Sequence, residues 1–329
     1  MATPGLDLAA LAGYVPSAGP LRARLIAGGR SNLTYEVTDG TGTWIVRRPP
    51  LGEVLASAHD MGREYRVLTA LRDTAVPVPR TYAFCADPGV IGAPFYVMAK
   101  AEGVPFRTAA ELAPRGRARV RRISEAMVDT LATLHAVDPD AVGLHGFGRP
   151  EGFLARQVHR WRVQLEHSPD RAAADQLHAR LAAAVPAESR HSVVHGDFRL
   201  DNLLVDEHDR ITALLDWEMA TLGDPLTDLA LLHAYDWIAR NDRAGALGDA
   251  PAAPGFLDPH RIAARYGCDR DLGWYHGLAF LKLAAVFAGI HHRYVNGQTV
   301  GDGFATAGTL VPGLLAAGLD VVSAPRGRR

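Results

Sequence analysis

Three side chains that suit phosphoryl-transfer chemistry lie close together in residues 193–218, which read VVHGDFRLDNLLVDEHDRITALLDWE. Asp197 is followed five residues later by Asn202, and Asp216 comes at the end of the next apolar stretch. A carboxylate can orient and deprotonate a substrate hydroxyl, which contributes roughly 10²–10⁴-fold to a rate. Magnesium prefers oxygen ligands and takes one or two carboxylates together with substrate phosphates. The sequence therefore predicts Asp197 as a catalytic base and Asn202 and Asp216 as Mg²⁺ ligands.

These residues meet only if the segment folds as a strand, a loop and a hairpin. The apolar run SVV predicts the strand, and the apolar residues 203–205 and 211–215 flank a polar DEHDR turn. Such a hairpin would return Asp216 to the side of Asn202. The same order of Asp, Asn and a second Asp is found in kinases. A single Asp or Asn near a turn is more often a cap, so the inference depends on all three together.

The N-terminal part predicts an antiparallel ribbon, with strands LRARLIA, LTYEV and TWIVRR. The first turn, GGRSN, contains Gly28, Gly29, Ser31 and Asn32. Glycine permits backbone conformations closed to other residues, and the polar side chains offer donors, so this loop is a candidate to close over the phosphates of a nucleotide. An ordinary hairpin turn is the alternative, because the loop is not GxGxxG.

A cation and a carboxylate follow in the order that kinases use. Arg47 ends the third strand, and Glu64 lies in residues 53–72, where apolar residues recur at helical spacing. A strand cation paired with a helix Glu positions the α- and β-phosphates of ATP in kinases. A surface Arg and a solvated Glu are the alternative interpretation of the same pair.

Two further strands, TYAFC and PFYVM, precede the connector MAKAEG. In a kinase-like arrangement this connector is the hinge, where Met98, Ala99 and Ala101 would contact the adenine; a plain strand-to-helix loop is the alternative. The expected fold class is α+β, with a small antiparallel-sheet N-lobe and a larger, mainly helical C-lobe. The N-lobe, the hinge and the C-lobe would span residues 1–98, 99–104 and 105–329.

Sequence patterns in the C-terminal part predict a core helix and residues that could bind the acceptor. Apolar residues at spacings of three and four in 120–134 predict a core helix. Arg156 and Arg160, one helical turn apart, form either an anion-binding edge for a phosphorylated or CoA-linked substrate or a solvated basic face. The Gly-, Ala-, Pro- and Asp-rich residues 236–259 predict a long loop and a candidate lid. Residues 274–294 predict the last long helix, with Trp274 and His291 as candidate substrate contacts.

Composition narrows the choice of partners. The chain has 329 residues, of which 48% are hydrophobic, so it can bury a substantial core. Its 35 Lys and Arg against 36 Asp and Glu give no argument for nucleic acid or for a membrane surface. Two cysteines are too few for a disulfide framework. The start lacks the pattern of a signal peptide, and the apolar residues 278–290 are short for a membrane span and include Lys282. We expect a soluble, cytoplasmic protein with a small-molecule partner.

Two other motifs favour structural roles. His195 has no second His or Cys at zinc spacing, so we expect it to form hydrogen bonds rather than bind a metal. Asp224 and Asp228, in GDPLTDLA, are expected to cap and brace the helix behind the catalytic loop.

The motifs HGDFRLDN, LLDWE and GDPLTDLA resemble the aminoglycoside phosphotransferase and choline kinase-like family, and the resemblance covers residues 28–295. WIVRRPP, LHAVDPDAVGL and FGRPEGFLARQVHRW look most similar to the phosphotransferase domain that is fused to some acyl-CoA dehydrogenases. The resemblance implies a protein-kinase-like fold, Asp197 as base, Asn202 and Asp216 on Mg²⁺, and phosphorylation of a small-molecule hydroxyl. For the fused branch it suggests a hydroxyacyl-CoA. Arg47 departs from the Lys of the family's antibiotic kinases, and Arg and Lys are not interchangeable.

The leading hypothesis is thus an ATP- and Mg²⁺-dependent phosphotransferase acting on a small-molecule hydroxyl. An antibiotic kinase for aminoglycosides or macrolides is an alternative, although polycations need an acidic pocket and no Glu follows Glu218. Asp236, Asp242 and Asp249 keep that alternative open. A nucleotide-binding pseudokinase scaffold is a second alternative, and a metal-dependent hydrolase built on His195 and Asp197 is a third.

Overall fold

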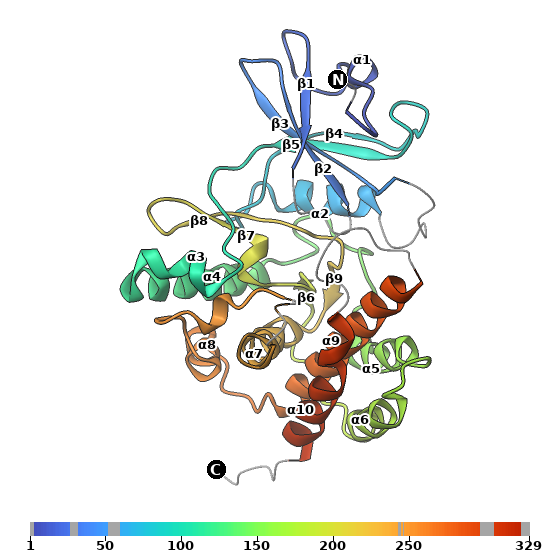
Figure 1. Cartoon of the computed structure of the whole chain (residues 1–329), viewed down its shortest axis with the longest axis vertical. Coiled ribbons are helices and arrows are strands. Elements are labelled where there is room, and N and C mark those ends of the chain that lie inside the picture. The colour runs from blue at the N-terminus through green and yellow to red at the C-terminus, as the bar shows by residue number, and fades with distance from the viewer. Residues whose placement is uncertain are drawn as a thin grey trace.

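The chain folds into two lobes. A computed structural model describes residues 3–26, 32–51, 60–242, 245, 247–296 and 306–323. A small lobe built on an antiparallel sheet lies above a larger lobe made mainly of helices (Figure 1). The predicted α+β, two-lobed fold is therefore confirmed.

The sheet of the N-lobe has the strand order β1-β2-β3-β5-β4, and every neighbouring pair is antiparallel. Its strands are β1 (Arg22–Leu25), β2 (Leu33–Thr38), β3 (Thr43–Arg48), β4 (Thr81–Cys85) and β5 (Phe95–Ala99). Side chains alternate between the two faces of a strand. Trp44 and Val46 pack on the outer face with the short helix α1 (Leu8–Leu11), whereas Ile45 packs toward the C-lobe core. Arg47 therefore lies on the inner face of the sheet.

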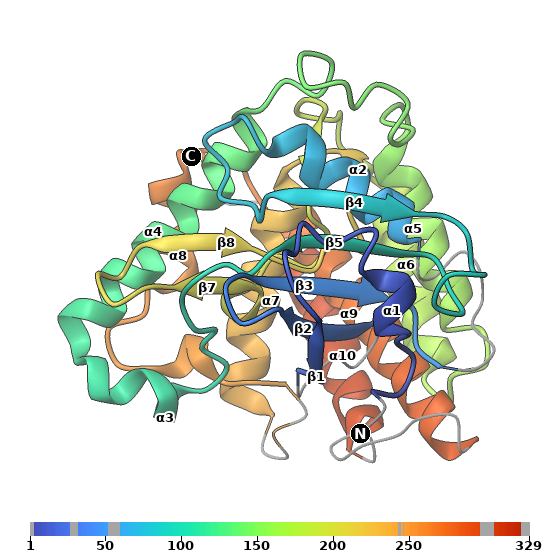
Figure 2. The same ribbon diagram turned by 90° about the horizontal axis from the view of Figure 1, so that it is seen from above.

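Helix α2 (Met61–Leu71) covers that inner face, as Figures 1 and 2 show from two directions. Asp60 caps its first turn by accepting a hydrogen bond from the amide of Arg63 at 2.9 Å. The helix buries Met61, Glu64, Val67, Leu68 and Leu71, a spacing of three and four that makes one face. Glu64 therefore shares a face with the apolar residues. The predicted helix is confirmed from Met61 onward, and residues 52–59 lie outside the described residues.

The C-lobe is built around helices α4, α7 and α9. Its elements are α3 (Ala109–Leu112), η1 (Ala113–Arg115), α4 (Arg117–Ala136), α5 (Phe153–Gln164), α6 (Arg171–Ala183), β6 (Ser192–Val194), η2 (Leu200–Asn202), β7 (Leu203–Val205), β8 (Ile211–Leu214), β9 (Thr221–Gly223), α7 (Leu226–Asn241), η3 (Ala250–Ala252), α8 (Pro259–Tyr266), α9 (Gly273–Val295), η4 (Ala307–Leu310) and α10 (Val311–Ser323). Helices α3, α4 and α8 lie on one side of α7, and α5 and α6 lie on the other (Figures 1 and 2). The predicted core helix is confirmed, since the predicted apolar stripe of α4 is buried.

Residues 236–259, predicted to be one long loop, are partly helical. Helix α7 continues to Asn241, and a short 3-10 helix follows at Ala250–Ala252. Asp236 and Arg240 form an ion pair across one helical turn at 2.7 Å, and Ile238, on another side of the helix, is buried in the core. The composition favoured a loop, but packing on the core extends the helix. A role as a lid stays a prediction.

Residues 274–294 were not the last helix, because α10 packs along α9 after them. Glycine is a poor helix former, and this segment contains Gly313 and Gly318. For that reason the sequence did not predict a helix here. A Cβ atom on Gly318 would come within 2.6 Å of the Leu177 side chain. The glycine that weakens the helix is thus the residue that lets it approach its neighbours.

Helix α9 is longer than the apolar stretch seen in the sequence. Its 23 residues are long and apolar enough, by length and composition alone, to cross a membrane. However, 61% of its most apolar window is buried inside the protein, where α5, α7 and α10 contact it. Its apolar character is thus explained by a central place in the C-lobe core.

The core role of α4 yields a stability prediction. Leu131→Ala should lower the free energy of unfolding by about 2–5 kcal/mol, because Leu131 is fully buried and the cavity left behind would not refill. Urea unfolding followed by circular dichroism measures this change. Arg121→Ala, at an exposed position of the same helix, is the control and should change the value by less than about 0.5 kcal/mol. Equal effects of the two substitutions would contradict the packing described here.

Candidate active site

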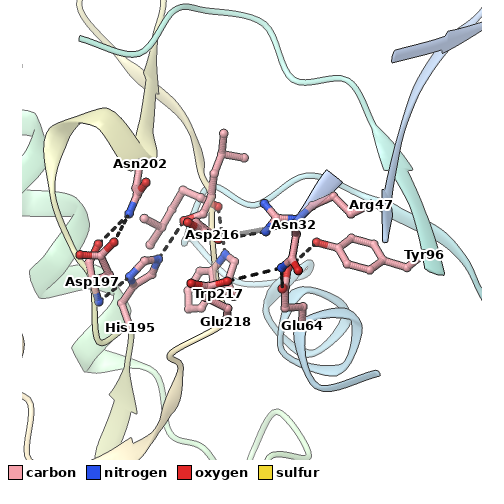
Figure 3. Close-up of polar contacts among 12 residues, drawn as sticks. Asn32, Arg47, Glu64, Tyr96, His195, Asp197, Asn202, Asp216, Trp217 and Glu218 are labelled. Carbon is pink, nitrogen blue, oxygen red and sulfur yellow. Dashed lines mark hydrogen bonds and ion pairs between the residues drawn. The ribbon is translucent and has the colours of Figure 1, made fainter. Parts of the chain in front are cut away.

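The predicted strand, loop and hairpin form as the sequence indicated. Strands β7 and β8 pair in antiparallel register with Leu203 opposite Leu214, and the amide of Leu215 donates to the carbonyl of Asn202 at 2.8 Å. Asp216 therefore lies beside Asn202. In Figure 3 its side chain lies between Asp197 on one side and Arg47 and Glu64 of the N-lobe on the other. Its backbone has φ of 65°, in the left-handed region that non-glycine residues seldom adopt. Such strain is typical of functional sites.

Asp197 is held on both of its carboxylate oxygens. The side-chain amide of Asn202 donates to the Asp197 carbonyl at 2.8 Å and to its Oδ2 at 3.1 Å. The hydroxyl of Tyr235, on α7, donates to Oδ1. Because the Asn202 nitrogen faces Asp197, the Oδ1 atom of Asn202 is directed away from it and suits a cation (Figure 3).

The loop that carries Asp197 is fixed through its backbone by a buried carboxylate. Asp228, which is fully buried, accepts hydrogen bonds from the amides of His195 at 2.6 Å and Gly196 at 2.8 Å, and His135 lies 3.3 Å away. Gly196 has φ of 83°, and a Cβ atom there would lie 2.7 Å from the Met219 carbonyl. Only glycine therefore fits this turn. Asp228 was expected to cap and brace its own helix, but its carboxylate instead holds the catalytic loop.

The pKa of Asp228 is set by these contacts. Burial alone would raise the pKa of its carboxyl, but the hydrogen bond with His135 and the nearby positive charge of Lys282 lower it below the ordinary value. Asp228 is therefore an anion under ordinary conditions and a strong acceptor for the two loop amides.

His195 makes hydrogen bonds within the protein. Its Nε2 bonds the Leu215 carbonyl at 2.9 Å, and its Nδ1 accepts from the amide of Asp197 at 3.2 Å. No cluster of three or more His, Cys, Asp or Glu side chains that could hold a metal occurs among the residues the structure describes. This geometry matches the hydrogen-bonding role predicted for His195 and gives no support to a zinc site.

Arg47 and Glu64, predicted to be partners, form a buried ion pair that also reaches Asp216 of the C-lobe. The Arg47 guanidinium contacts Glu64 at 3.3 Å through Nε and Asp216 at 2.9 Å through Nη2. Tyr96 donates to Glu64 at 2.8 Å. Asn32 donates to Glu64 at 2.8 Å and to Glu218 at 3.4 Å, which links the predicted phosphate loop to the C-lobe. Arg47 thus spans two carboxylates, as a planar guanidinium can.

Burial of this network affects its charges. Burial raises the pKa of the Glu64 carboxyl, against the lowering effect of Arg47. The positive charge of Arg47 thus opposes the rise in the pKa of Glu64 that burial causes.

Of the remaining residues predicted to contact the nucleotide, some lie outside the described residues and the others lie where the two lobes join. Gly28, Gly29 and Ser31 lie outside the described residues. Met98 is buried on the inner face of the sheet, and the Ala99 amide donates to the Arg80 carbonyl at 2.7 Å. Ala101 lies just after β5 in the segment that joins the lobes. The geometry therefore places these three residues at the junction, and their contact with adenine stays a prediction.

A cavity of about 460 Å³ opens beside the catalytic loop, next to Gly196 and Glu218. It contains both predicted anion-binding residues, Arg156 and Arg160. The charged side chains that line it are Asp60, Arg63, Arg149, Arg156, Arg160, Glu218 and Lys282. Cations therefore outnumber carboxylates in this basic cavity.

Individual cations of the basic cavity have distinct surroundings. Arg156 donates to the carbonyls of Arg149 and Glu151, and the Arg160 guanidinium lies 4.8 Å from the centre of the Trp161 ring. Lys282, from α9, donates to the Gly196 carbonyl, and burial lowers the pKa of its ammonium. Lys282 thus connects the cavity with the catalytic loop.

Trp274 and His291 do not line the basic cavity. Trp274 is buried and donates to the Leu181 carbonyl at 2.9 Å, which joins α9 to α6. His291 lies against Gly308, near the start of η4. Their predicted contact with substrate stays a prediction without geometric support.

Sequence reasoning missed Tyr235 and Lys282. Tyr235 lies on a helix whose other residues are mostly apolar, so it resembled a core position. Lys282 was noticed only as a charge that interrupts an apolar stretch. A signal was present for Tyr235, because it lies seven residues after Asp228, about two helical turns, and therefore on the same face of α7.

The role of Asp228 yields a pH-dependent prediction. Asp228→Asn should lower the free energy of unfolding by about 2–3 kcal/mol at pH 7, because a charged acceptor of two buried amides is lost. A carboxyl whose pKa is lowered on folding stabilises above its unfolded pKa of about 3.9. That contribution disappears as the pH falls through the folded value. The difference between wild type and variant should therefore shrink below about pH 4, as urea unfolding at several pH values would measure.

Asp73→Asn, at an exposed side chain, is the control and should change stability little at any pH. A difference between wild type and Asp228→Asn that stayed constant from pH 7 to pH 3 would contradict the role assigned to Asp228.

Sequence comparisons agree with this geometry. Residues 22–264 match the model of the phosphotransferase enzyme family. Acyl-CoA dehydrogenase family member 11 of Rattus norvegicus is 34% identical over 299 residues, which cover 86% of this chain and 38% of that protein. Probable acyl-CoA dehydrogenase IBR3 of Arabidopsis thaliana is 30% identical over 317 residues, which cover 88% of this chain and 38% of that protein. The chain thus spans about two fifths of the length of these relatives.

Solved structures show the same fold. A candidate aminoglycoside phosphotransferase from Ralstonia eutropha JMP134 is 31% identical, with a TM-score of 0.81 over 95% of this chain and 96% of that one. A mutant of aminoglycoside phosphotransferase APH(4)-Ia, in complex with AMP-PNP and hygromycin B, is 16% identical, with a TM-score of 0.63 over 98% and 99% of the two chains. On the family match and on the site described above, the chain belongs to the phosphotransferase enzyme family.

Proposed function

We propose that the chain is an ATP- and Mg²⁺-dependent phosphotransferase that phosphorylates a hydroxyl group of a small molecule. The observation that carries the proposal is the meeting of Asp197, Asn202 and Asp216 at one loop and hairpin, with Arg47 bonded to Asp216. The complex of APH(4)-Ia with AMP-PNP and hygromycin B, which has the same fold, supports both a nucleotide and a small-molecule acceptor.

In the proposed reaction the oxygen of the acceptor hydroxyl attacks the γ-phosphorus of ATP. The bond from that phosphorus to the β–γ bridging oxygen breaks, ADP leaves, and the hydroxyl proton passes to Asp197. Positioning and charge neutralisation provide most of the catalysis in such a transfer. Asp197 orients the acceptor hydroxyl, and its loop is held still by Asp228. Arg47 contacts the phosphates, and Glu64 holds Arg47 in place.

The residues at the hairpin fit a magnesium ion. Asp216 offers a carboxylate that is 28% exposed, and Asn202 offers an amide oxygen whose direction its own nitrogen fixes. One carboxylate and one amide oxygen, together with phosphate oxygens, are a donor set that Mg²⁺ commonly accepts. When bound, Mg²⁺ would neutralise charge on the phosphates. We also propose residues 99–104 as the hinge between lobes at 1–98 and 105–329.

Substitutions of Asp197 and Asp216 distinguish the role of a catalytic base from that of a metal ligand. Asp197→Asn should reduce turnover roughly 10²–10⁴-fold, since it removes the base, and should leave binding of Mg-ATP within about twofold. Asp216→Asn should instead weaken nucleotide binding in the presence of Mg²⁺. Steady-state kinetics and calorimetric titration of AMP-PNP, with and without Mg²⁺, measure the two effects. Asp73→Asn is the matched control for loss of one negative charge.

The proposal fails if the wild type binds no nucleotide in a Mg²⁺-dependent way. It also fails if Asp197→Asn keeps full turnover, because the group named as the base would then have no part in the reaction.

We further propose that the acceptor carries anionic groups, and that a hydroxyacyl-CoA is the class that fits best. The basic cavity beside Gly196 supports this choice, because its cations would attract phosphates and repel a polycationic aminoglycoside. The names of the relatives from Rattus norvegicus and Arabidopsis thaliana point to acyl-CoA chemistry in the proteins that carry this domain.

Charge reversal at the basic cavity tests the acceptor class. Arg160→Glu should raise the KM for 3-hydroxybutyryl-CoA about 10-fold, the loss of one contact between charged groups, and should change kcat by less than about threefold. Added salt should raise the wild-type KM in the same direction. Arg121→Glu, on α4 outside the cavity, is the matched control. If the wild type instead phosphorylated hygromycin B or a macrolide and ignored CoA thioesters, the anionic-acceptor proposal would be wrong.

A further inference from the structure

We propose that Tyr235 is a positioning residue for the phosphoryl transfer, because its hydroxyl fixes the rotation of the Asp197 carboxylate. This inference rests on the proposed function. The Tyr235 hydroxyl donates to Asp197 Oδ1 while Asn202 donates to Oδ2 at 3.1 Å. The two oxygens of the carboxylate are therefore held by groups from different elements, α7 and the catalytic loop itself.

The helix that supplies Tyr235 is the one that braces the loop. Asp228 holds the amides of His195 and Gly196, and Tyr235 holds the side chain of the next residue, Asp197. Asp228 and Tyr235 are seven residues apart, which places them on one face of α7 about 10 Å apart along the helix axis. One rigid helix therefore sets both the path of the loop and the orientation of its carboxylate.

The phenol ring is itself fixed. Tyr235 is 7% exposed, and the Arg199 guanidinium, which is paired with Asp201, lies 5.4 Å from the centre of its ring. Burial raises the pKa of the Tyr235 hydroxyl well above its usual value, and the adjacent charge of Asp197 raises it further. The hydroxyl therefore keeps its proton and remains a donor throughout the physiological pH range.

The chemical value of this contact lies in preorganisation. The terminal torsion of an Asp side chain is broad, so an untethered carboxylate samples many orientations. An ionised carboxylate has about four lone-pair sites. Tyr235 and Asn202 each occupy one, which leaves others for the acceptor hydroxyl. A misplacement of about 1 Å in a reacting group can reduce a rate about 10²-fold.

The alternative is that Asp197 merely satisfies a buried phenol. The two roles differ in what Tyr235→Phe would change. A structural role alters stability and leaves kcat alone. A positioning role lowers kcat through Asp197 and leaves the affinity for nucleotide alone.

A double-mutant cycle distinguishes these roles. Wild type, Tyr235→Phe, Asp197→Asn and the double variant are compared with Mg-ATP, with 3-hydroxybutyryl-CoA or water as the acceptor. We expect Tyr235→Phe to lower kcat about 10- to 100-fold with the affinity for AMP-PNP unchanged within twofold. In the Asp197→Asn background the same change should alter the residual rate by less than twofold. Tyr35→Phe removes a hydrogen bond from another buried phenol, in the N-lobe, to the Pro4 carbonyl and should leave kcat unchanged.

Two results would overturn the inference while the proposed function stands. One is a kcat of Tyr235→Phe within twofold of wild type, and the other is an equal loss in both backgrounds, which would mean that Tyr235 acts independently of Asp197. If the wild type transfers no phosphoryl group to a hydroxyl acceptor, the proposed function itself fails, and this inference, which rests on it, fails with it. Thermal unfolding of each variant shows whether the folded fraction, rather than kcat, has changed.

Discussion

The buried carboxylate of Asp228 is the group on which the site depends. Peptide amides in a turn need acceptors, and the turn at Gly196 has its amides directed into the protein. Asp228 accepts from two successive amides there and so determines the path of the loop before any side chain on it is considered. Because Asp228 stands on α7, which packs along α9, the loop takes its position from the centre of the C-lobe core. The carboxylate of Asp197, which this loop carries, therefore has little freedom to move.

The N-lobe contributes Arg47 and Glu64 to the site, and the periods of the strand and the helix explain why both side chains point inward. Side chains repeat every two residues in a strand and about every 3.6 residues in a helix. On β3, the inner face therefore presents Arg47 two residues after the apolar Ile45, and the buried face of α2 presents Glu64 among apolar residues. Asp216 completes a bridge from this pair to the C-lobe. A carboxylate that sits in a strained backbone conformation thus lies where the two lobes meet.

Much of this arrangement could be predicted from the sequence, because it depends on the spacing of residues that are close together in the chain. The Asp, Asn and Asp spacing, the hairpin, the helix 120–134 and the pairing of Arg47 with Glu64 all depend on short periods or fixed offsets. Elements that depend on tertiary packing were not predictable. Helix α10 contains glycines that single-sequence propensity counts against, yet Gly313 and Gly318 let it pack closely. The basic cavity draws on segments as distant as Asp60 and Lys282, so no window of sequence contains it.

The central claim is that this constellation transfers a phosphoryl group to a hydroxyl. Phosphorus-31 NMR of the wild type with Mg-ATP and a panel of hydroxylated acyl-CoAs, aminoglycosides, macrolides and amino alcohols tests it most directly. The account predicts that ATP signals are replaced by those of ADP and of a new phosphate monoester, in equal amounts. A spectrum in which ATP persists with every acceptor, or in which ADP appears only with inorganic phosphate, would contradict it.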